Sequence, residues 1–194
     1  MMEYIVKPLL SWYDGHARVL PWREEISPYR VWVSEIMLQQ TRVEAVKPYF
    51  ERFVKALPDV HALAECPEDE LLKLWEGLGY YNRVRNMQKA ARVIVDKYDG
   101  KFPADYKKLL ELPGIGHYTA GAVSSIAFGI CMPAVDGNVL RVLSRLQASY
   151  DDILSQSVKH TFEEELQKII PEDRAGDFNQ ALIEIGAIVC VPNG

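Results

Sequence analysis

The stretch LPGIGHYTAGAVSSIAFGICMPAVDGNVLRVLS, residues 112–144, decides how this chain is interpreted. It combines two glycines separated by one residue, an apolar run, and a single aspartate directly before Gly-Asn. Pro113 and Gly114 favour a tight turn, and Gly116 allows another backbone to approach closely. A helix that follows at once presents unpaired backbone N–H groups, which can bind a phosphate without a lysine. The turn is therefore either a phosphate-binding hairpin or a plain connection between helices.

Apolar residues recur at helical spacing along nearly the whole chain, and no segment shows the convincing alternation of a strand. Ser27 followed by Pro28 predicts a helix start, and Thr41 with Glu44 forms a capping-box pattern. Helices are predicted over residues 28–39, 43–57, 67–75, 82–98, 103–110, 117–128 and 137–146. Two more helices follow, and the last of them ends near Val189. Short, closely spaced helices of this kind predict a compact all-α fold.

The composition is that of an ordinary globular protein, with 194 residues, 48% hydrophobic and 25% charged. A formal net charge of -5 argues weakly against nucleic acid as a partner, although a local basic face can still bind it. We find no signal peptide and no run long enough to span a membrane, so we expect a cytoplasmic protein. The three cysteines are too few and too far apart for a disulfide framework.

Two carboxylates stand out from their surroundings. Glu35 lies in the apolar stretch VWVSEIMLQQT, so it is either at an exposed helix edge or buried. Burial raises the pKa of a carboxyl group and keeps it protonated near neutral pH, as a general acid requires. Asp136 is either the N-cap of the next helix, an acidic group that acts on a substrate, or both. An acid and an ionised partner in different environments suit the scission of a glycosidic bond.

Five motifs carry a resemblance that covers nearly the whole chain. The segment of about residues 105–128, in which LPGIG joins two predicted helices, resembles the helix-hairpin-helix DNA-binding motif. Together with it, the motifs LPWR (20–23), SEIMLQQT (34–41), GLGYYNRVRN (77–86) and VDGNV (135–139) resemble the MutY-type adenine DNA glycosylases. The resemblance implies an all-α fold of two helical lobes with the active site in the cleft between them. A six-helix lobe would span 21–133, and a second lobe would combine 1–20 with 134–194.

The resemblance also implies a base excision repair reaction that hydrolyses the N-glycosyl bond of a flipped adenine. Glu35 would protonate the base, and Asp136 would stabilise the cationic sugar. Asn138 would orient Asp136 and the water, and Tyr118 would hydrogen-bond at the catalytic carboxylates. Strand-cleaving relatives such as endonuclease III have a lysine at the place of Tyr118. A tyrosine forms no Schiff base, so we expect little or no strand cleavage.

Substrate contacts follow from the same resemblance. The adenine pocket would be formed by Arg18, Leu20, Trp22, Arg23, Val43, Gln180 and Ile183. The DNA would be contacted by Gln40, Thr41, Tyr80, Gly114, Gly116 and His117, with Gln40 and Tyr80 wedged into the base stack. A sodium, potassium or calcium ion on the carbonyls of Leu110, Leu112 and Ile115 would bridge the hairpin to a phosphate.

Each of these residues also has a simpler interpretation. In a generic protein, Leu20 and Trp22 more often belong to the hydrophobic core than to a pocket, and Gln40 more often lies at a solvated helix end. Tyr80 follows Gly79 and could close a turn. Arg83 and Arg85 could contact phosphate or form a solvated face.

Members of this family carry a [4Fe-4S] cluster on four cysteines, the first of them placed like Cys190. Here the sequence ends at Gly194, so we expect this chain to lack the other ligands and the domain that reads 8-oxoguanine in the family. We expect Cys190 to hold no cluster in this chain. The sequence is then a shortened piece of a longer protein, a naturally reduced form, or one whose end was not recorded.

The expected partner is double-stranded DNA with adenine opposite 8-oxoguanine or guanine. The expected protein is a bacterial, nucleoid-associated monomer with no membrane contact. Two alternatives stay open at this point. One is a related glycosylase for thymine or uracil opposite guanine, and the other is a non-catalytic DNA-binding helical module.

Overall fold

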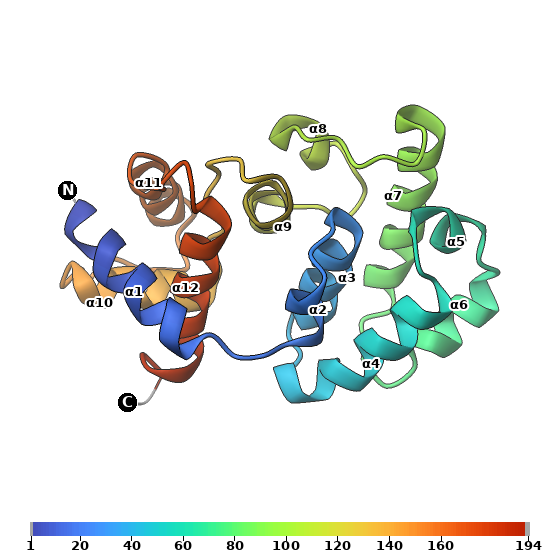
Figure 1. Ribbon diagram of the computed structural model, residues 1–194, viewed down its shortest axis with the longest axis horizontal. Helices are drawn as coiled ribbons and strands as arrows, with labels where there is room; N and C mark the ends of the chain where they lie inside the picture. Colours follow the sequence, from blue (N-terminus) through green and yellow to red (C-terminus); the bar gives the residue numbers. More distant parts are fainter. Residues whose placement is uncertain (1, 193–194) are drawn as a thin grey trace. The chain divides into compact units, whose positions relative to one another are not determined.

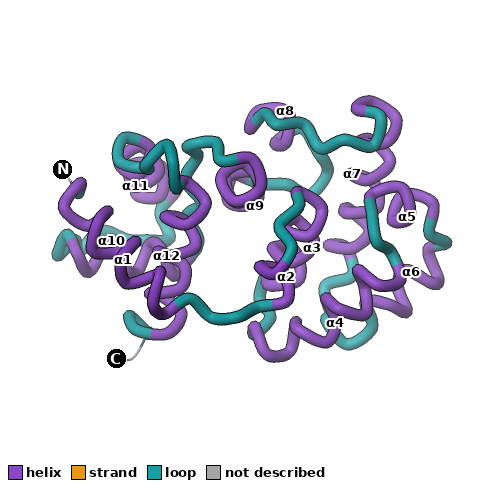
Figure 2. The backbone as a smooth tube through the Cα atoms, viewed as in Figure 1, coloured by secondary structure: helices purple, strands orange, loops and turns teal. Residues whose placement is uncertain are grey.

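A computed structural model of the chain describes residues 2–192. These residues form helices and connecting loops and contain no strand, which confirms the predicted all-α class (Figures 1 and 2). The chain divides into two compact units, Met1–Arg18 with Gly121–Gly194, and Val19–Ala120. We call them the terminal unit and the central unit. Residues 121–133, which the sequence analysis assigned to the longer lobe, belong to the terminal unit.

The central unit consists of short helices around an aromatic core. Its helices are α2 (Pro21–Glu24), α3 (Pro28–Leu38), α4 (Val43–Ala56), α5 (Val60–Glu65), α6 (Glu68–Trp75), α7 (Asn82–Tyr98), α8 (Tyr106–Leu110) and the beginning of α9 (His117–Ala122). Helix α5 packs on α7, and α3 packs on α4. Trp32, Phe50, Phe53 and Trp75 are fully buried, and the rings of Phe53 and Trp75 meet edge to face at 5.9 Å.

Capping residues explain where several of these helices begin. The predicted start at Ser27 is confirmed, because its hydroxyl accepts a hydrogen bond from the backbone N–H of Arg30 at 3.2 Å. The capping box at Thr41 is wrong: α4 begins at Val43, and the Thr41 hydroxyl donates to the carbonyl of Gln39 instead. The helix predicted from Pro103 begins at Tyr106, where the Asp105 carboxylate accepts from Lys108 N–H at 3.0 Å.

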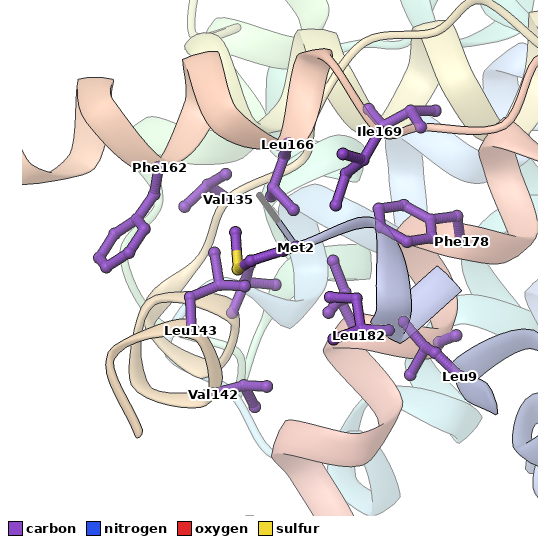
Figure 3. Packing of buried hydrophobic residues seen from close by; sticks show 14 of the residues in the cluster. Met2, Leu9, Val135, Val142, Leu143, Phe162, Leu166, Ile169, Phe178 and Leu182 are labelled. Carbon is purple, nitrogen blue, oxygen red and sulfur yellow. The ribbon is translucent and has the colours of Figure 1, made fainter. Parts of the chain in front are cut away.

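The terminal unit joins the beginning of the chain to its second half. It contains a 3-10 turn (Glu3–Ile5), α1 (Val6–His16), the end of α9, the π-helical turn Val123–Ala127, α10 (Gly137–Leu146), α11 (Gln156–Gln167) and α12 (Ala175–Ile188). The predicted helix that ends near Val189 is thus confirmed as α12. Both α1 and α10 pack against α12. Figure 3 shows buried side chains of α1, α10, α11 and α12 converging, among them Leu9, Val142, Leu143, Phe162, Leu166, Phe178 and Leu182.

Three helices were not predicted from the sequence, α1, α2 and α5. Helices α2 and α5 have four and six residues, too few to show an apolar period. Asp59 caps α5 by accepting from Ala62 N–H at 2.9 Å. Within residues 2–192, no helix combines the length and the apolar character needed to cross a membrane.

Candidate active site

Glu35 is a buried carboxyl group on α3, with 7% of its surface exposed. The hydroxyl of Tyr118 donates a hydrogen bond to Glu35 Oε2 at 2.6 Å. Tyr118 is the second residue of α9, so the turn at 112–116 determines where its ring lies. The structure thereby brings together two of the predicted site residues within the central unit. The short hydroxyl–carboxyl contact holds Glu35 in one orientation inside an apolar environment.

Asp136 lies in the terminal unit, directly before α10. One of its oxygens accepts from the backbone N–H of Val139 at 2.8 Å, so Asp136 is the N-cap of that helix. The other oxygen accepts from the side-chain amide of Asn138, also at 2.8 Å. The same carboxylate thus caps the helix and accepts a hydrogen bond from Asn138, as predicted. N–H donors on both oxygens complement a negative charge on this group.

The amide of Asn138 has a fixed direction, which matters because its two ends are chemically different. Arg141 donates to Asn138 Oδ1 at 2.9 Å, so the NH2 end is the one that faces Asp136. The same guanidinium donates to the carbonyls of Gly186 at 2.7 Å and Cys190 at 2.9 Å. Asp136 is therefore held through Asn138 by a side chain that is itself anchored on α12 and on the segment after it.

The chain that leads into Asp136 is held by Asn179, a fully buried residue of α12. Its amide oxygen accepts from Ala134 N–H at 3.0 Å, and its amide NH2 donates to the carbonyl of Met132 at 2.8 Å. The NH2 also donates to the hydroxyl of Ser125 at 2.8 Å. Asn179 was not among the residues predicted from the sequence. An uncharged polar residue inside the apolar run FNQALIEIGAI was the available signal.

Two glycines let backbone segments approach this part of the chain closely. A Cβ atom on Gly121 would collide with the carbonyl oxygen of Pro133. A Cβ atom on Gly186 would lie 2.7 Å from Asn138 Cβ and 3.1 Å from its carbonyl oxygen. These close contacts place α9 and α12 directly against the segment that carries Asp136.

Arg18 forms a two-pronged ion pair with Glu184 of α12. The Nε–Oε1 distance is 2.7 Å and the Nη2–Oε2 distance is 2.9 Å, and Glu184 is fully buried. Arg18 was assigned to the adenine pocket together with Gln180 and Ile183 of the same unit, and Gln180 is buried. Glu184 was missed, although ALIEIGAI surrounds it with apolar residues as VWVSEIMLQQT surrounds Glu35.

The other predicted pocket residues belong to the central unit. Leu20 and Trp22 are buried, and the Trp22 ring meets Phe50 edge to face at 5.5 Å. Arg23 lies in α2, and Val43 is the first residue of α4, which packs against α2.

The residues predicted to wedge into DNA sit on two sharp turns. Gln40 and Tyr80 are exposed, and both have left-handed backbone conformations, with φ of 57° and 47°. The interpretation of Arg83 as part of a solvated face is wrong. Its partly buried guanidinium donates to backbone carbonyls of both turns. Arg85 is exposed and pairs with Glu68 at 2.8 Å.

The hairpin depends on Gly114, whose φ is 77° and whose added Cβ would lie 2.8 Å from Asn86 Cβ. Its turn is closed by the N–H of Ile115, which donates to the carbonyl of Leu112 at 3.1 Å. Gly116 is exposed, and a Cβ there would meet nothing within 4 Å. His117 follows, and its Nδ1 shares a hydrogen bond with the hydroxyl of Tyr106 at 2.8 Å.

Cys190 lies just after α12, where Arg145 Nη1 is 3.2 Å from its Sγ. A [4Fe-4S] cluster needs four cysteine ligands, whereas this sequence has three cysteines, and Cys66 belongs to the other unit. Among residues 2–192, no three or more His, Cys, Asp and Glu side chains are grouped so that they could hold a metal ion. Cys190 by itself supplies one thiolate of the four that such a cluster needs.

Comparison with known proteins places these features in a family. The HhH-GPD superfamily of base excision DNA repair proteins matches residues 33–172, well over half of the chain. The chain belongs to the HhH-GPD superfamily. This result confirms the resemblance to helix-hairpin-helix glycosylases and, with the helices described above, the all-α fold class predicted from it.

Individual HhH-GPD relatives match almost the whole chain. It is 42% identical over 184 residues to "Adenine DNA glycosylase" of Buchnera aphidicola subsp. Baizongia pistaciae, covering 94% of this chain and 52% of that protein. It is 45% identical over 193 residues to "Adenine DNA glycosylase" of Homo sapiens, covering 95% and 35%. The chain thus spans about half or less of the length of these relatives.

Two solved structures of HhH-GPD type share the fold. "Structure of a thermostable thymine-DNA glycosylase" is 29% identical with a TM-score of 0.86, covering 98% of this chain and 88% of that one. "Structure of a non-covalent Endonuclease III-DNA Complex" is 28% identical with a TM-score of 0.82, covering 100% and 87%.

Proposed function

We propose that this chain excises adenine from duplex DNA by hydrolysing its N-glycosyl bond, with adenine opposite 8-oxoguanine or guanine as the substrate. The observation that carries the proposal is the buried Glu35 carboxyl, held by a tyrosine hydroxyl at 2.6 Å. Such a carboxyl can supply a proton to a base. The identity of 42% and 45% to proteins named adenine DNA glycosylase supports adenine as that base.

In the proposed reaction, Glu35 acts as general acid and Tyr118 keeps its carboxyl in position. Glu35 transfers a proton to the adenine ring while the C1′–N9 bond breaks, and the bonding electrons leave with the base. The sugar develops positive charge, as in other glycosidic cleavages, and Asp136 stabilises it. A water oxygen then bonds to C1′ and loses a proton to a carboxylate. The products are free adenine and an abasic site.

Asn138 and Tyr118 complete the assignment of catalytic residues. Asn138 keeps its NH2 on Asp136 because Arg141 holds the other end of the amide, and this hydrogen bond orients the carboxylate. Tyr118 supplies a hydroxyl, not an amine, so no Schiff base forms and the strand stays intact.

The adenine contacts remain those predicted from the resemblance: Arg18, Leu20, Trp22, Arg23, Val43, Gln180 and Ile183. The DNA contacts are Gln40, Thr41, Tyr80, Gly114, Gly116 and His117, with a cation at the hairpin carbonyls. The proposed protein acts as a monomer on the DNA of a bacterial nucleoid.

Thymine is a second candidate base, favoured by the TM-score of 0.86 to a thymine-DNA glycosylase. Release of free base separates the candidates. Duplexes with one A opposite 8-oxoguanine, one A opposite G, one T opposite G, or A opposite T are incubated with excess protein, and the bases are separated by chromatography. We expect adenine from the first two duplexes only. Thymine release without adenine would support the second candidate, and no release from any duplex would contradict both.

A further inference from the structure

The side chain of Arg83 donates hydrogen bonds to backbone carbonyls of two separate segments. Its Nη1 donates to the carbonyls of Ile36 at 2.9 Å, Met37 at 3.3 Å and Gln39. Its Nη2 donates to the carbonyls of Leu78 at 3.0 Å and Gly79 at 3.3 Å. The first three carbonyls end helix α3, where they have no partner inside the helix and attract a cation. One guanidinium thus ties the end of α3 to the turn before α7.

Each of the two segments leads directly into a strained residue. Gln40 follows Gln39 with φ of 57°, and Tyr80 follows Gly79 with φ of 47°. A left-handed conformation costs free energy in any residue with a Cβ, and it persists only where the surroundings enforce it. The hydrogen bonds of Arg83 to the preceding carbonyls provide that enforcement at both turns.

The two strained residues are also the exposed ends of these turns. Tyr80 keeps 66% of its surface exposed, although it is a large aromatic residue, and its ring lies 5.5 Å from the Arg83 guanidinium carbon. Gln40 is exposed as well. An exposed aromatic ring stacks on nucleobases, and wedges between base steps unstack DNA. Such insertion is stronger when the inserted groups are already held in shape.

We propose that Arg83 is a positioning residue that holds Gln40 and Tyr80 in the conformation in which they enter the base stack of DNA. The inference rests on the proposed function, because it assumes that a base is extruded from a duplex. Lysine cannot replace the planar fork of arginine, which presents its N–H groups in two directions at once.

The test compares Arg83→Lys with the wild-type chain and with Arg85→Gln. Arg85 lies on the same helix and is exposed, so its substitution removes one positive charge without touching the turns. The probe is a duplex with 2-aminopurine beside an A opposite 8-oxoguanine, because its fluorescence rises when the neighbouring bases unstack. Every protein in this titration also carries Glu35→Gln, so that the adenine stays attached while the fluorescence is read. A second duplex carries the same adenine in an unpaired bulge, where the stack is already open. Thermal unfolding is followed for every variant.

For Arg83→Lys we expect a fluorescence increase reduced by about tenfold on the paired duplex, which corresponds to the loss of one charged hydrogen bond. The half-saturating protein concentration should rise by a similar factor there, yet stay within about twofold of wild type on the bulged duplex. Arg85→Gln should leave the fluorescence increase intact. Equal defects of Arg83→Lys on both duplexes would mean a merely structural role, and an undiminished signal would overturn the inference. Base release by the wild type is scored separately and decides only the proposed function.

Discussion

Gly186→Ala tests whether the position of Asp136 depends on the close contact between α12 and Asn138. The new Cβ would lie 2.7 Å from Asn138 Cβ, whereas carbon atoms settle at about 3.5–4.0 Å, so Asn138 has to move by roughly 0.8 Å. Its backbone carbonyl oxygen, at 3.1 Å, prevents the side chain from solving this alone. Because Asn138 donates to Asp136, the displacement is passed to the carboxylate.

Stability and activity should respond differently to this substitution. Overpacking costs about 1–3 kcal/mol, but alanine favours a helix over glycine by about 1 kcal/mol, so the net loss of stability is about 0–2 kcal/mol. A catalytic group displaced by about 1 Å costs about 100-fold in rate. We therefore expect single-turnover adenine release to fall by about 10- to 100-fold in a protein that still unfolds cooperatively.

Gly15→Ala is the matched control. Gly15 lies in α1, and a Cβ there would meet nothing within 4 Å. This variant should gain about 0.5–1 kcal/mol of stability and excise adenine like the wild type. Wild-type excision by Gly186→Ala would refute the argument, because it would mean that the contact does not constrain Asp136.

Three further substitutions test other parts of the site. Glu35→Gln keeps the shape of the side chain but removes the proton that it would transfer, so the rate of single-turnover excision should fall by about 100- to 10,000-fold. DNA affinity, measured by fluorescence anisotropy, should change little. Excision near the wild-type rate would mean that Glu35 takes no part in the reaction. Asn179→Leu leaves the buried N–H of Ala134 and the partly buried carbonyl of Met132 without their side-chain partner, and denaturant titration should show a loss of stability of about 2–4 kcal/mol. A loss below about 1 kcal/mol would mean that water replaces the amide. Glu184→Gln leaves the Arg18 guanidinium without its charged partner, so the free energy of unfolding in the same titration should fall by about 1–3 kcal/mol. An unchanged value would show that the ion pair is neutral for stability.

The helices that carry the site could be predicted because they are long enough to show a period or begin at a clear cap. Ser27 and Asp136 were both identified as capping candidates, and each accepts the expected backbone N–H. Thr41 failed because its hydroxyl is used by the preceding turn, and a competing local hydrogen bond of this kind leaves no trace in the sequence pattern. Helix α5, with six residues, is simply too short.

Partners that are distant in sequence could not be predicted. Glu184 carries the same signal as Glu35, a carboxylate in an apolar run, but its partner Arg18 lies 166 residues away. Arg83 stands in the polar stretch NRVRN, which is typical of a solvated face, and only the folded turns supply its carbonyl acceptors. The capping role of single residues was therefore easier to predict than the contacts between residues that are distant in sequence.

The most direct test of the central claim is the fate of a duplex with a single A opposite 8-oxoguanine, incubated with excess protein and divided into two samples. One sample is analysed for free adenine, and the other for strand length before and after alkali. We predict stoichiometric free adenine and an intact strand that breaks only after alkali, since Glu35 and Tyr118 provide a proton donor and a hydroxyl but no amine. Strand breakage without alkali, or an intact strand after alkali with no adenine released, would contradict the account.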